Sequence, residues 1–435
     1  MSVEKMKEII KNFQFQFENQ EYGEVVSVYD GIALVSGLVD VFLDEVLIFK
    51  NSNLKGIVVS MDENLITTMI LGDYREITNK SEVIRTKDFF KIGVSNEIIG
   101  RVIDGFGNPI DEKGEIKIDE MIEIDAEPIP MIERDAVKSQ LVTGIKLVDC
   151  LIPVGFGQRQ LILGDPNTGK TSIGLTTMIS QKDNPNVVSV YVSIGKRIDN
   201  VSNLLKNLKE NNVKNFVIVR ANASDPVSMK ILAPMVGCAI GEYFRGKKKH
   251  AILIYDDLTS HAVSYRELSL ILRKSPGREA YPGNIFYLHA KLLERACQLN
   301  KMKGSGSLTA LPIIETYNGD ISNYIPTNVI SITDGQLFLS QELFTEKQRP
   351  AIKTGVSVSR VGGECQYNIV KKLVGSTKIE IAQYEEYVEF TKFSSQIKPE
   401  IKKILDKGNL IFMALSQNRD PVPIWKQILI LYGLK

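Results

Sequence analysis

The sequence LILGDPNTGKT, at residues 161–171, decides how the centre of this 435-residue chain folds. Three apolar residues suited to a buried strand precede a glycine-rich turn, and a helical pattern begins after the turn. This order fits Gly-x-x-x-x-Gly-Lys-Ser/Thr in the strand–loop–helix setting that the motif requires. Glycines allow consecutive backbone N–H groups to surround phosphate oxygens, and the helix N-terminus adds positive potential. The sequence therefore predicts a phosphate-binding loop, and a chance glycine-rich turn is the weaker interpretation.

The side chains of this loop indicate a nucleotide that binds together with Mg²⁺. Lys170 is expected to reach the β- and γ-phosphates, and the Thr171 hydroxyl is expected to ligate the metal. A carboxylate that organises the metal is needed at the end of a neighbouring strand, where Asp256 follows the apolar stretch 251–255. Taken alone, Asp256 would be an acidic turn residue, but the loop favours the metal role. The residues expected at the phosphates are Gly164, Asp165, Pro166, Asn167, Thr168, Gly169, Lys170 and Thr171.

Composition and charge exclude several classes of protein. Apolar residues make up 43% and charged residues 24% of the chain, which is typical of globular domains and not of disordered or collagen-like chains. The net charge of +1 argues against a nucleic-acid partner, which usually requires a basic excess. No apolar run approaches the ~18 residues of a membrane-spanning helix. Residues 1–20 lack the layout of a secretory signal.

Cysteine and histidine are too scattered to predict a metal centre. No C-x-x-C pair occurs, and the three histidines never adopt zinc-ligand spacing. Isolated thiols in a long chain suit a reducing cytosol, where they pack as small core residues. The four cysteines are Cys150, Cys238, Cys297 and Cys365.

The pattern along the chain predicts four segments. Residues 1–20 have the spacing of a short amphipathic helix, and residues 21–90 carry short β-branched runs separated by turns, typical of a small β-barrel. Residues 91–373 alternate apolar strands with helical patterns, which favours an α/β domain with a parallel sheet. Residues 374–435 carry Lys, Glu, Ile and Leu at helical spacing, which predicts a short helical bundle. The expected strands are 24–29, 32–34, 45–49, 56–61, 65–71, 160–163, 187–192, 216–220, 251–255 and 329–332.

Further motifs lie at residues 100–111, 241–245, 255–258, 276–280, 306–316, 326–336 and 357–363. Through these motifs, almost the whole chain resembles the α subunit of F-type rotary ATP synthases. The motifs distinguish that subunit from its catalytic β partner and from the flagellar and secretion ATPases of similar architecture.

The resemblance implies a three-domain subunit: a β-barrel, a P-loop NTPase domain of the RecA-like kind, and a helical domain. It would alternate with catalytic β-type subunits in a hexameric α3β3 ring around a γ-type shaft, with a stalk subunit at its N-terminal helix. The ring would couple ATP hydrolysis or synthesis to rotation, and proton transport would pass through a membrane sector that this chain contacts only indirectly. The expected location is the cytoplasm, at the inner face of the cell membrane.

The same resemblance implies the remaining site residues. Ser331 and Arg360 would face the neighbouring β site, with Arg360 acting as an arginine finger in trans. Without the resemblance, Glu315 and Arg349 would be interpreted as an interdomain ion pair, and Phe344 and Pro350 as core. Besides the phosphate-binding loop and Asp256, the nucleotide pocket would contain Ser172, Glu315, Phe344, Arg349, Pro350 and Gln417.

In that family the α site binds Mg-ATP without turning it over, so the chain itself is not expected to be catalytic. Catalytic relatives carry a Glu after the strand 190–194, where it polarises the attacking water; this chain has Lys196 there. A cation at neutral pH cannot accept a proton from water. The usual α subunit has Gln at this place, so Lys196 departs from both patterns. Pro166 and Asn167 stand in the loop where α subunits usually have Arg and Gln.

Two other interpretations stay open. One is an α-like subunit of a specialised rotary motor that does not drive proton transport, favoured by the altered loop and by a C-terminal domain that ends early. The other is a homohexameric ATPase of the secretion or helicase kind, which would need its own water-activating carboxylate where Lys196 stands. A scaffold that has lost nucleotide binding conflicts with the intact Lys170, Thr171 and Asp256.

Overall fold

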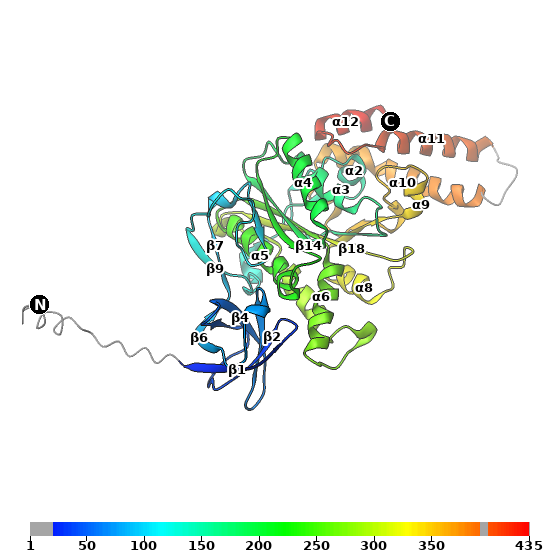
Figure 1. The fold of residues 1–435 in the computed structure, drawn as a ribbon. Helices are drawn as coiled ribbons and strands as arrows, with labels where there is room; N and C mark the ends of the chain where they lie inside the picture. Colours follow the sequence, from blue (N-terminus) through cyan, green and yellow to red (C-terminus); the bar gives the residue numbers. More distant parts are fainter. Residues whose placement is uncertain (1–20, 392–398, 435) are drawn as a thin grey trace, which may run out of the picture. The chain divides into compact units, whose positions relative to one another are not determined.

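The computed structural model describes residues 21–391 and 399–434, and the chain divides into two units at Phe90. The helix expected at residues 1–20 lies outside the described residues. The first unit is a closed antiparallel barrel with the strand order β1-β2-β5-β4-β3-β6 (Figure 1). Its strands are β1 Tyr22–Tyr29, β2 Ile32–Ser36, β3 Glu45–Phe49, β4 Leu54–Met61, β5 Ile66–Leu71 and β6 Glu82–Phe89.

The sixth barrel strand, β6, is the one that hydrophobic patterning missed. Its sequence EVIRTKDF is rich in charge, so it has no clear apolar alternation. Arg85 explains how a charged strand can close the barrel: its Nε lies 3.0 Å from Oε1 of Glu45, whose side chain is fully buried. The buried charge is tolerated because it is paired and hydrogen-bonded.

The second unit is built on one large sheet. Its order is β20-β19-β13-β18-β16-β14-β15-β8, and neighbours from β19 to β8 are parallel. Antiparallel strands add β20 at one edge and β17 with β10 beside β18. The strands are β8 Val102–Asp104, β10 Arg134–Asp135, β13 Leu161–Gly164, β14 Val187–Lys196, β15 Phe216–Asn222, β16 His250–Asp256, β17 Cys297–Leu299, β18 Ser307–Glu315, β19 Gly335–Leu339 and β20 Val358–Ser359. Two small sheets pair β7 Lys91–Val94 with β9 Glu120–Glu123, and β11 Gln140–Leu141 with β12 Val154–Gly155.

Helices cover both faces of this sheet. Gly237 of α5 packs against Leu253, while Gly174 of α3 packs against Ile254, the next residue of β16. Because successive side chains of a strand point to opposite faces, α3 and α5 lie on opposite sides. The helices of this part are α2 Lys146–Leu151, α3 Lys170–Ser180, α4 Ile198–Glu210, α5 Val227–Gly246, α6 Leu258–Ile271, α7 Ile285–Glu294, α8 Tyr324–Ile332 and α9 Gln341–Thr345.

The strand expected at residues 329–332 is wrong: these residues form the last turn of α8. The run Val-Ile-Ser-Ile is short and β-branched, so its local pattern does not distinguish a strand from a helix. Tertiary packing decides, because Ile325 and Val329 are buried one helical turn apart. The strand of this region is β19, which follows directly after α8.

The last described part of the chain, residues 368–391 and 399–434, forms three helices: α10 Asn368–Thr391, α11 Pro399–Leu415 and α12 Ile424–Gly433. In Figure 1 they lie together in orange and red, and α10 contacts both α11 and α12. Helix α10 runs through residue 374, where the sequence places a domain boundary, and that boundary stays a prediction.

Helix α5 is long and apolar enough to cross a membrane by length and composition. However, 72% of its most apolar window is buried inside the protein, as its place against β14 and β16 requires. It is a core helix of the sheet.

Gly408 tests the packing of α11 on α10. A Cβ atom at Gly408 would lie 2.2 Å from Cδ2 of Tyr384, whereas one at Gly375 in α10 would meet nothing within 4 Å. We expect Gly408→Ala to weaken the helix pair by about 1–3 kcal/mol through overpacking. Gly375→Ala, the matched control, should stabilise α10 by roughly 0.5–1 kcal/mol through helix propensity. Hydrogen exchange of the α11 amides measures the first effect and that of the α10 amides the second. Equal exchange of the α11 amides in the two variants would contradict the packing.

Candidate functional site

The candidate site lies where four adjacent parallel strands end. In the sheet, Gly164 at the end of β13 pairs with Glu315 at the end of β18, and Asp256 of β16 pairs with Ser193 of β14. The carboxyl ends of parallel strands share one edge, so the residues that follow them are brought together there. The sequence placed Asp256 on a strand neighbouring the loop strand. That detail is wrong, because β18 lies between β13 and β16.

The phosphate-binding loop is held by its own backbone. Gly169, immediately before α3, has φ of +102°, a conformation that L side chains rarely adopt. The Lys170 ammonium is buried inside the loop and donates to the carbonyl oxygens of Gly164 at 2.9 Å and Asp165 at 2.7 Å. Burial lowers the pKa of Lys170, and Glu315 opposes that shift. The loop thus presents its ammonium from a fixed position.

Asp165 fixes the other side of the loop. Its Oδ1 accepts hydrogen bonds from the Thr316 hydroxyl at 2.8 Å and from the Gly319 backbone N–H at 2.9 Å. Both donors come from the segment after β18, so this contact joins the loop to the next strand of the sheet. Asp165 therefore acts as a support of the loop.

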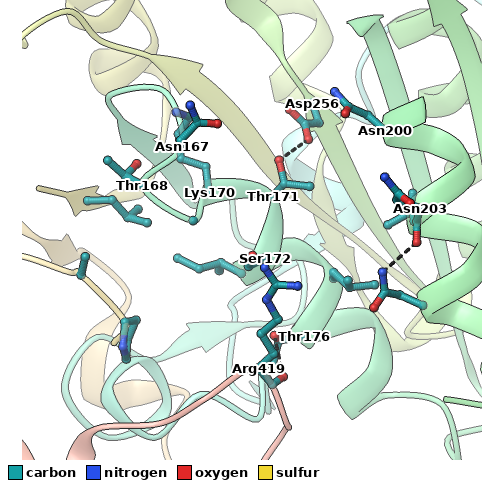
Figure 2. Close-up of a pocket in the computed structure, with 18 of the residues that line it drawn as sticks. Asn167, Thr168, Lys170, Thr171, Ser172, Thr176, Asn200, Asn203, Asp256 and Arg419 are labelled. Carbon is teal, nitrogen blue, oxygen red and sulfur yellow. Dashed lines mark hydrogen bonds between the residues drawn. The ribbon is translucent and has the colours of Figure 1, made fainter. Parts of the chain in front are cut away.

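Thr171 and Asp256 meet at the start of α3, as the motif predicts. The Thr171 hydroxyl donates to Oδ2 of Asp256 at 2.7 Å (Figure 2), and the buried Tyr191 hydroxyl donates to the same oxygen at 2.5 Å. Burial, together with Asp256, raises the pKa of Tyr191 well above its usual value. Oδ1 of Asp256 is buried and accepts no hydrogen bond from the described residues. A hydroxyl and a carboxylate are oxygen donors of the kind that Mg²⁺ prefers, although the Lys196 ammonium lies 3.2 Å from Oδ1 of Asp256.

Lys196 reaches the same point from the end of β14. Its Nζ lies 2.5 Å from Oδ2 of Asp257, 3.2 Å from Oδ1 of Asp256 and 3.5 Å from Oε1 of Glu315. Burial lowers the pKa of Lys196, but the three carboxylates have the larger combined effect and raise this pKa above its usual value. Glu315 also lies 3.8 Å from Nζ of Lys170. This cluster, which we call the five-charge cluster, comprises Lys170, Lys196, Asp256, Asp257 and Glu315.

A cavity of about 1040 Å³ opens beside the five-charge cluster. Of the predicted loop residues, those from Pro166 to Thr171 line the cavity, whereas Gly164 and Asp165 do not. The structure thus brings the predicted pocket residues around one space. Those that line it are Pro166, Asn167, Thr168, Gly169, Lys170, Thr171, Ser172, Asp256, Glu315, Phe344, Arg349, Pro350 and Gln417.

An aromatic and a cationic side chain form one wall of the cavity. The Arg349 guanidinium lies 3.6 Å from the centre of the Phe344 ring and donates to the Phe344 carbonyl at 2.8 Å. Arg349 is therefore held by a cation–π contact and a backbone acceptor. The ion pair between Glu315 and Arg349, considered from the sequence alone, is not formed: among the described residues, Glu315 forms its ion pairs with Lys170 and Lys196.

The loop after α11 closes the cavity and is fixed by Gln417. Its Oε1 accepts from the Lys146 backbone N–H at 2.9 Å, and its Nε2 donates to the carbonyl oxygens of Gly144 at 2.7 Å and Asp420 at 2.8 Å. The Gln417 backbone N–H donates to the Arg349 carbonyl at 2.8 Å. These bonds join the C-terminal helices to the start of α2 and to the wall of the cavity.

Asp149 ties α12 to the same part of the chain. The carboxylate is fully buried and accepts hydrogen bonds from Thr143, Gly144 and the Gln427 amide of α12. Burial raises the pKa of Asp149 to about 6, and these hydrogen bonds oppose the shift. Gln427 thus links α12 directly to the segment that Gln417 also binds.

Ser331 and Arg360 do not line the cavity. Both are exposed, Ser331 near the end of α8 and Arg360 after β20. The Arg360 backbone N–H donates to the Asp334 carbonyl at 2.8 Å, and Asp334 is held by a bidentate contact with Arg159. Within residues 21–391 and 399–434, no hydrogen bond or ion pair holds the Arg360 guanidinium.

Several lining residues escaped the sequence analysis. Helix α4 presents Asn200, Asn203 and Asn207 to the cavity, and Arg419 also lines it. Figure 2 labels Asn200, Asn203 and Arg419. The spacing of three and four residues puts the asparagines on one helical face, a signal that a search for polar faces would have found. Tyr191 gave no such signal, because it stands in an apolar strand that looks like core.

Gln417 provides a test of how the covering loop is held. Gln417→Ala removes three hydrogen bonds, and at about 0.5–1.5 kcal/mol each the loop should open at least about tenfold more often. Trypsin should then cleave after Arg419 about tenfold faster, as measured by mass spectrometry. Asn418→Ala is the control, since Asn418 lines the cavity but makes no hydrogen bond to the described residues. Equal cleavage of both variants would show that Gln417 does not fix the loop.

Comparison with known proteins agrees with this architecture. Models of the ATP synthase alpha/beta family match the β-barrel domain at residues 19–87, the nucleotide-binding domain at 144–359 and the C terminal domain at 366–435. ATP synthase subunit alpha of Helicobacter acinonychis (strain Sheeba) is 46% identical over 430 residues, which are 98% of this chain and 85% of the relative. The same subunit of Helicobacter pylori (strain Shi470) gives the same values. The chain therefore belongs to the ATP synthase alpha subunit family.

Proposed function

We propose that this chain is the nucleotide-binding, non-catalytic α-type subunit of a hexameric F-type rotary ATPase. It alternates with catalytic β-type subunits around a γ-type shaft, and its N-terminal residues 1–20 contact a stalk subunit. The complex couples ATP hydrolysis or synthesis to rotation and to proton transport, and it lies on the cytoplasmic face of the cell membrane. Support comes from the family and from the charges at the site.

The observation that carries the proposal is the position of Lys196. A general base must lie within reach of the attacking water and must accept its proton. The strand end beside the cavity instead offers a protonated ammonium, 19% exposed, that is ion-paired with Asp256, Asp257 and Glu315. A carboxylate in contact with a cation is a weaker proton acceptor, because the cation stabilises its ionised form. Binding without turnover follows from this arrangement.

The proposed ligand is ATP or ADP with Mg²⁺. The loop N–H groups and Lys170 would hold the phosphates, while Thr171 and Asp256 would hold the metal, which neutralises phosphate charge when bound. Phe344, Arg349, Pro350 and Gln417 line the part of the cavity that would receive the base and ribose.

Arg360 is proposed to act on the neighbouring β site. Phosphoryl transfer builds charge on equatorial oxygens, and a planar guanidinium supplied in trans can bind two of them at once. Two features suit this role: the side chain is exposed, and its backbone is anchored through Asp334 and Arg159. Ser331, which is exposed near the end of α8 and lies three residues before Asp334, is proposed to face that site too.

A specialised rotary motor that does not drive proton transport is the second candidate. The observation that favours it is the departure of the nucleotide site from the usual α pattern at Pro166, Asn167 and Lys196, all of which line the cavity. The subunits that copurify with this chain distinguish the candidates: proton-channel subunits support the first, and their absence from an intact, active ring supports the second.

The purified chain should bind Mg-ATP and hydrolyse it negligibly. Calorimetry and phosphate release on the same sample measure both properties. Lys170→Ala removes the ammonium that lies in the loop, so ATP affinity should fall at least about tenfold, as expected for a charged hydrogen bond. The exposed Lys50→Ala in the barrel serves as the charge-matched control and should bind ATP normally. Turnover near one per second, in protein free of β subunit, would show that the chain is catalytic.

Arg360→Lys tests the arginine finger, because it keeps the charge and loses the planar fork. Arginine fingers contribute about 10³–10⁵ in rate, so hydrolysis by the assembled ring should fall at least about a hundredfold. Ring mass and nucleotide occupancy should stay normal. Arg75→Lys, at an exposed barrel position, should leave hydrolysis unchanged. Normal turnover of the Arg360 variant, or failure of its ring to assemble, would refute the assignment.

A further inference from the structure

Lys196 is placed in the cavity by a bend at the end of β14. The pairing of β14 with β15 shifts register between Ile194 and Lys196, and Gly195 has φ of +66°. Glycine adopts this conformation without steric cost, so the strand turns there. The Lys196 ammonium consequently points toward the ends of β16 and β18 and lines the cavity.

The five-charge cluster has an unusual net charge for a site that binds a polyanion together with a divalent cation. Three carboxylates and two ammonium groups, linked by contacts of 2.5–3.8 Å, leave a net charge of −1. With a neutral side chain in place of Lys196 the net charge would be −2. That second negative charge would have to be offset by a cation from solution before triphosphate could bind well.

The carboxylates also have fixed supports, which keeps the ammonium in place. Oδ1 of Asp257 caps α6 by accepting from the Ser260 N–H at 2.6 Å, and its Oδ2 contacts Lys196. The Glu315 backbone N–H donates to the Thr259 hydroxyl at 2.9 Å. Moving the ammonium away would leave Asp257, which is 1% exposed, as an unpaired buried charge, and that is costly.

The geometry points to Lys196 as a built-in counter-ion that makes nucleotide binding at this site largely independent of Mg²⁺. This inference rests on the proposed nucleotide binding. The ammonium lies beside Asp256, the carboxylate expected to organise the metal, so it weakens the attraction of that carboxylate for a further cation. The same charge attracts the phosphates of metal-free ATP. Both effects reduce the difference in affinity between ATP and Mg-ATP.

The burial of the ammonium strengthens both effects. Because Lys196 is only 19% exposed, solvent and salt screen it less than a surface lysine. A lysine also suits this task sterically, since it presents a compact point charge with several donors.

The experiment is ATP titration of the full chain by calorimetry, with saturating Mg²⁺ and with excess EDTA. For the unmodified chain, the dissociation constant should rise no more than about tenfold when Mg²⁺ is removed. For Lys196→Gln it should rise at least about a hundredfold, because the site loses its internal cation. Lys196→Arg should behave like the unmodified chain. Lys206→Gln, which loses a charge at an α4 side chain that is 74% exposed and outside the cavity, is the control.

Each outcome distinguishes this inference from the proposed function. Absence of ATP binding to the unmodified chain under both conditions would sink the proposed function itself. Tight binding with Mg²⁺ and a loss of a hundredfold or more in EDTA, measured on the unmodified chain, would overturn only the role of Lys196. This second measurement needs no variant, so it holds even if Lys196→Gln fails to fold. A Lys196→Gln variant that binds equally well under both conditions would likewise overturn the role, leaving the ammonium as a structural partner of Asp257.

Discussion

The parallel order of β13, β18, β16 and β14 is the constraint on which the rest of the site depends. These strands end at one edge of the sheet, so the phosphate-binding loop, Glu315, Asp256 and Lys196 meet although the sequence spreads them over 152 residues. The helices on both faces bury the strands and leave that edge as the place where polar groups gather. Electrostatics then set the chemistry: cations and carboxylates are interleaved, and no charge in the cluster lacks a partner of opposite sign.

The C-terminal helices complete the site from outside the sheet. Gln417 holds the covering loop to Gly144 and Lys146, while Gln427 of α12 binds Asp149 a short distance along the same segment. Amide side chains suit this task because they offer donors and acceptors at once. The segment 143–150 therefore serves two neighbours, the cavity and the helices, through buried polar contacts.

Sequence reasoning was strongest where a motif fixes the backbone. The loop at 164–171 and its strand and helix followed from residue spacing alone, and the ends of β16 followed from the apolar run before Asp256. It failed where packing decides. The apolar run 329–332 is helical because Ile325 and Val329 share a buried face. The charged strand β6 closes the barrel because Arg85 forms an ion pair with the buried Glu45 of β3. The direction of the Lys196 side chain depends on a bulge, and such a bend is not encoded in local periodicity.

The buried carboxylate of Asp149 also has a mechanical consequence. It accepts hydrogen bonds from Thr143 and Gly144 and from Gln427 of α12. Helix α12 therefore cannot move without breaking these hydrogen bonds or moving the segment 143–150 with it. The same segment holds Gln417 at the mouth of the cavity. A displacement of α12 would therefore also displace the loop that closes the cavity. By the same coupling, a ligand that fixes this loop would restrict the motion of α12.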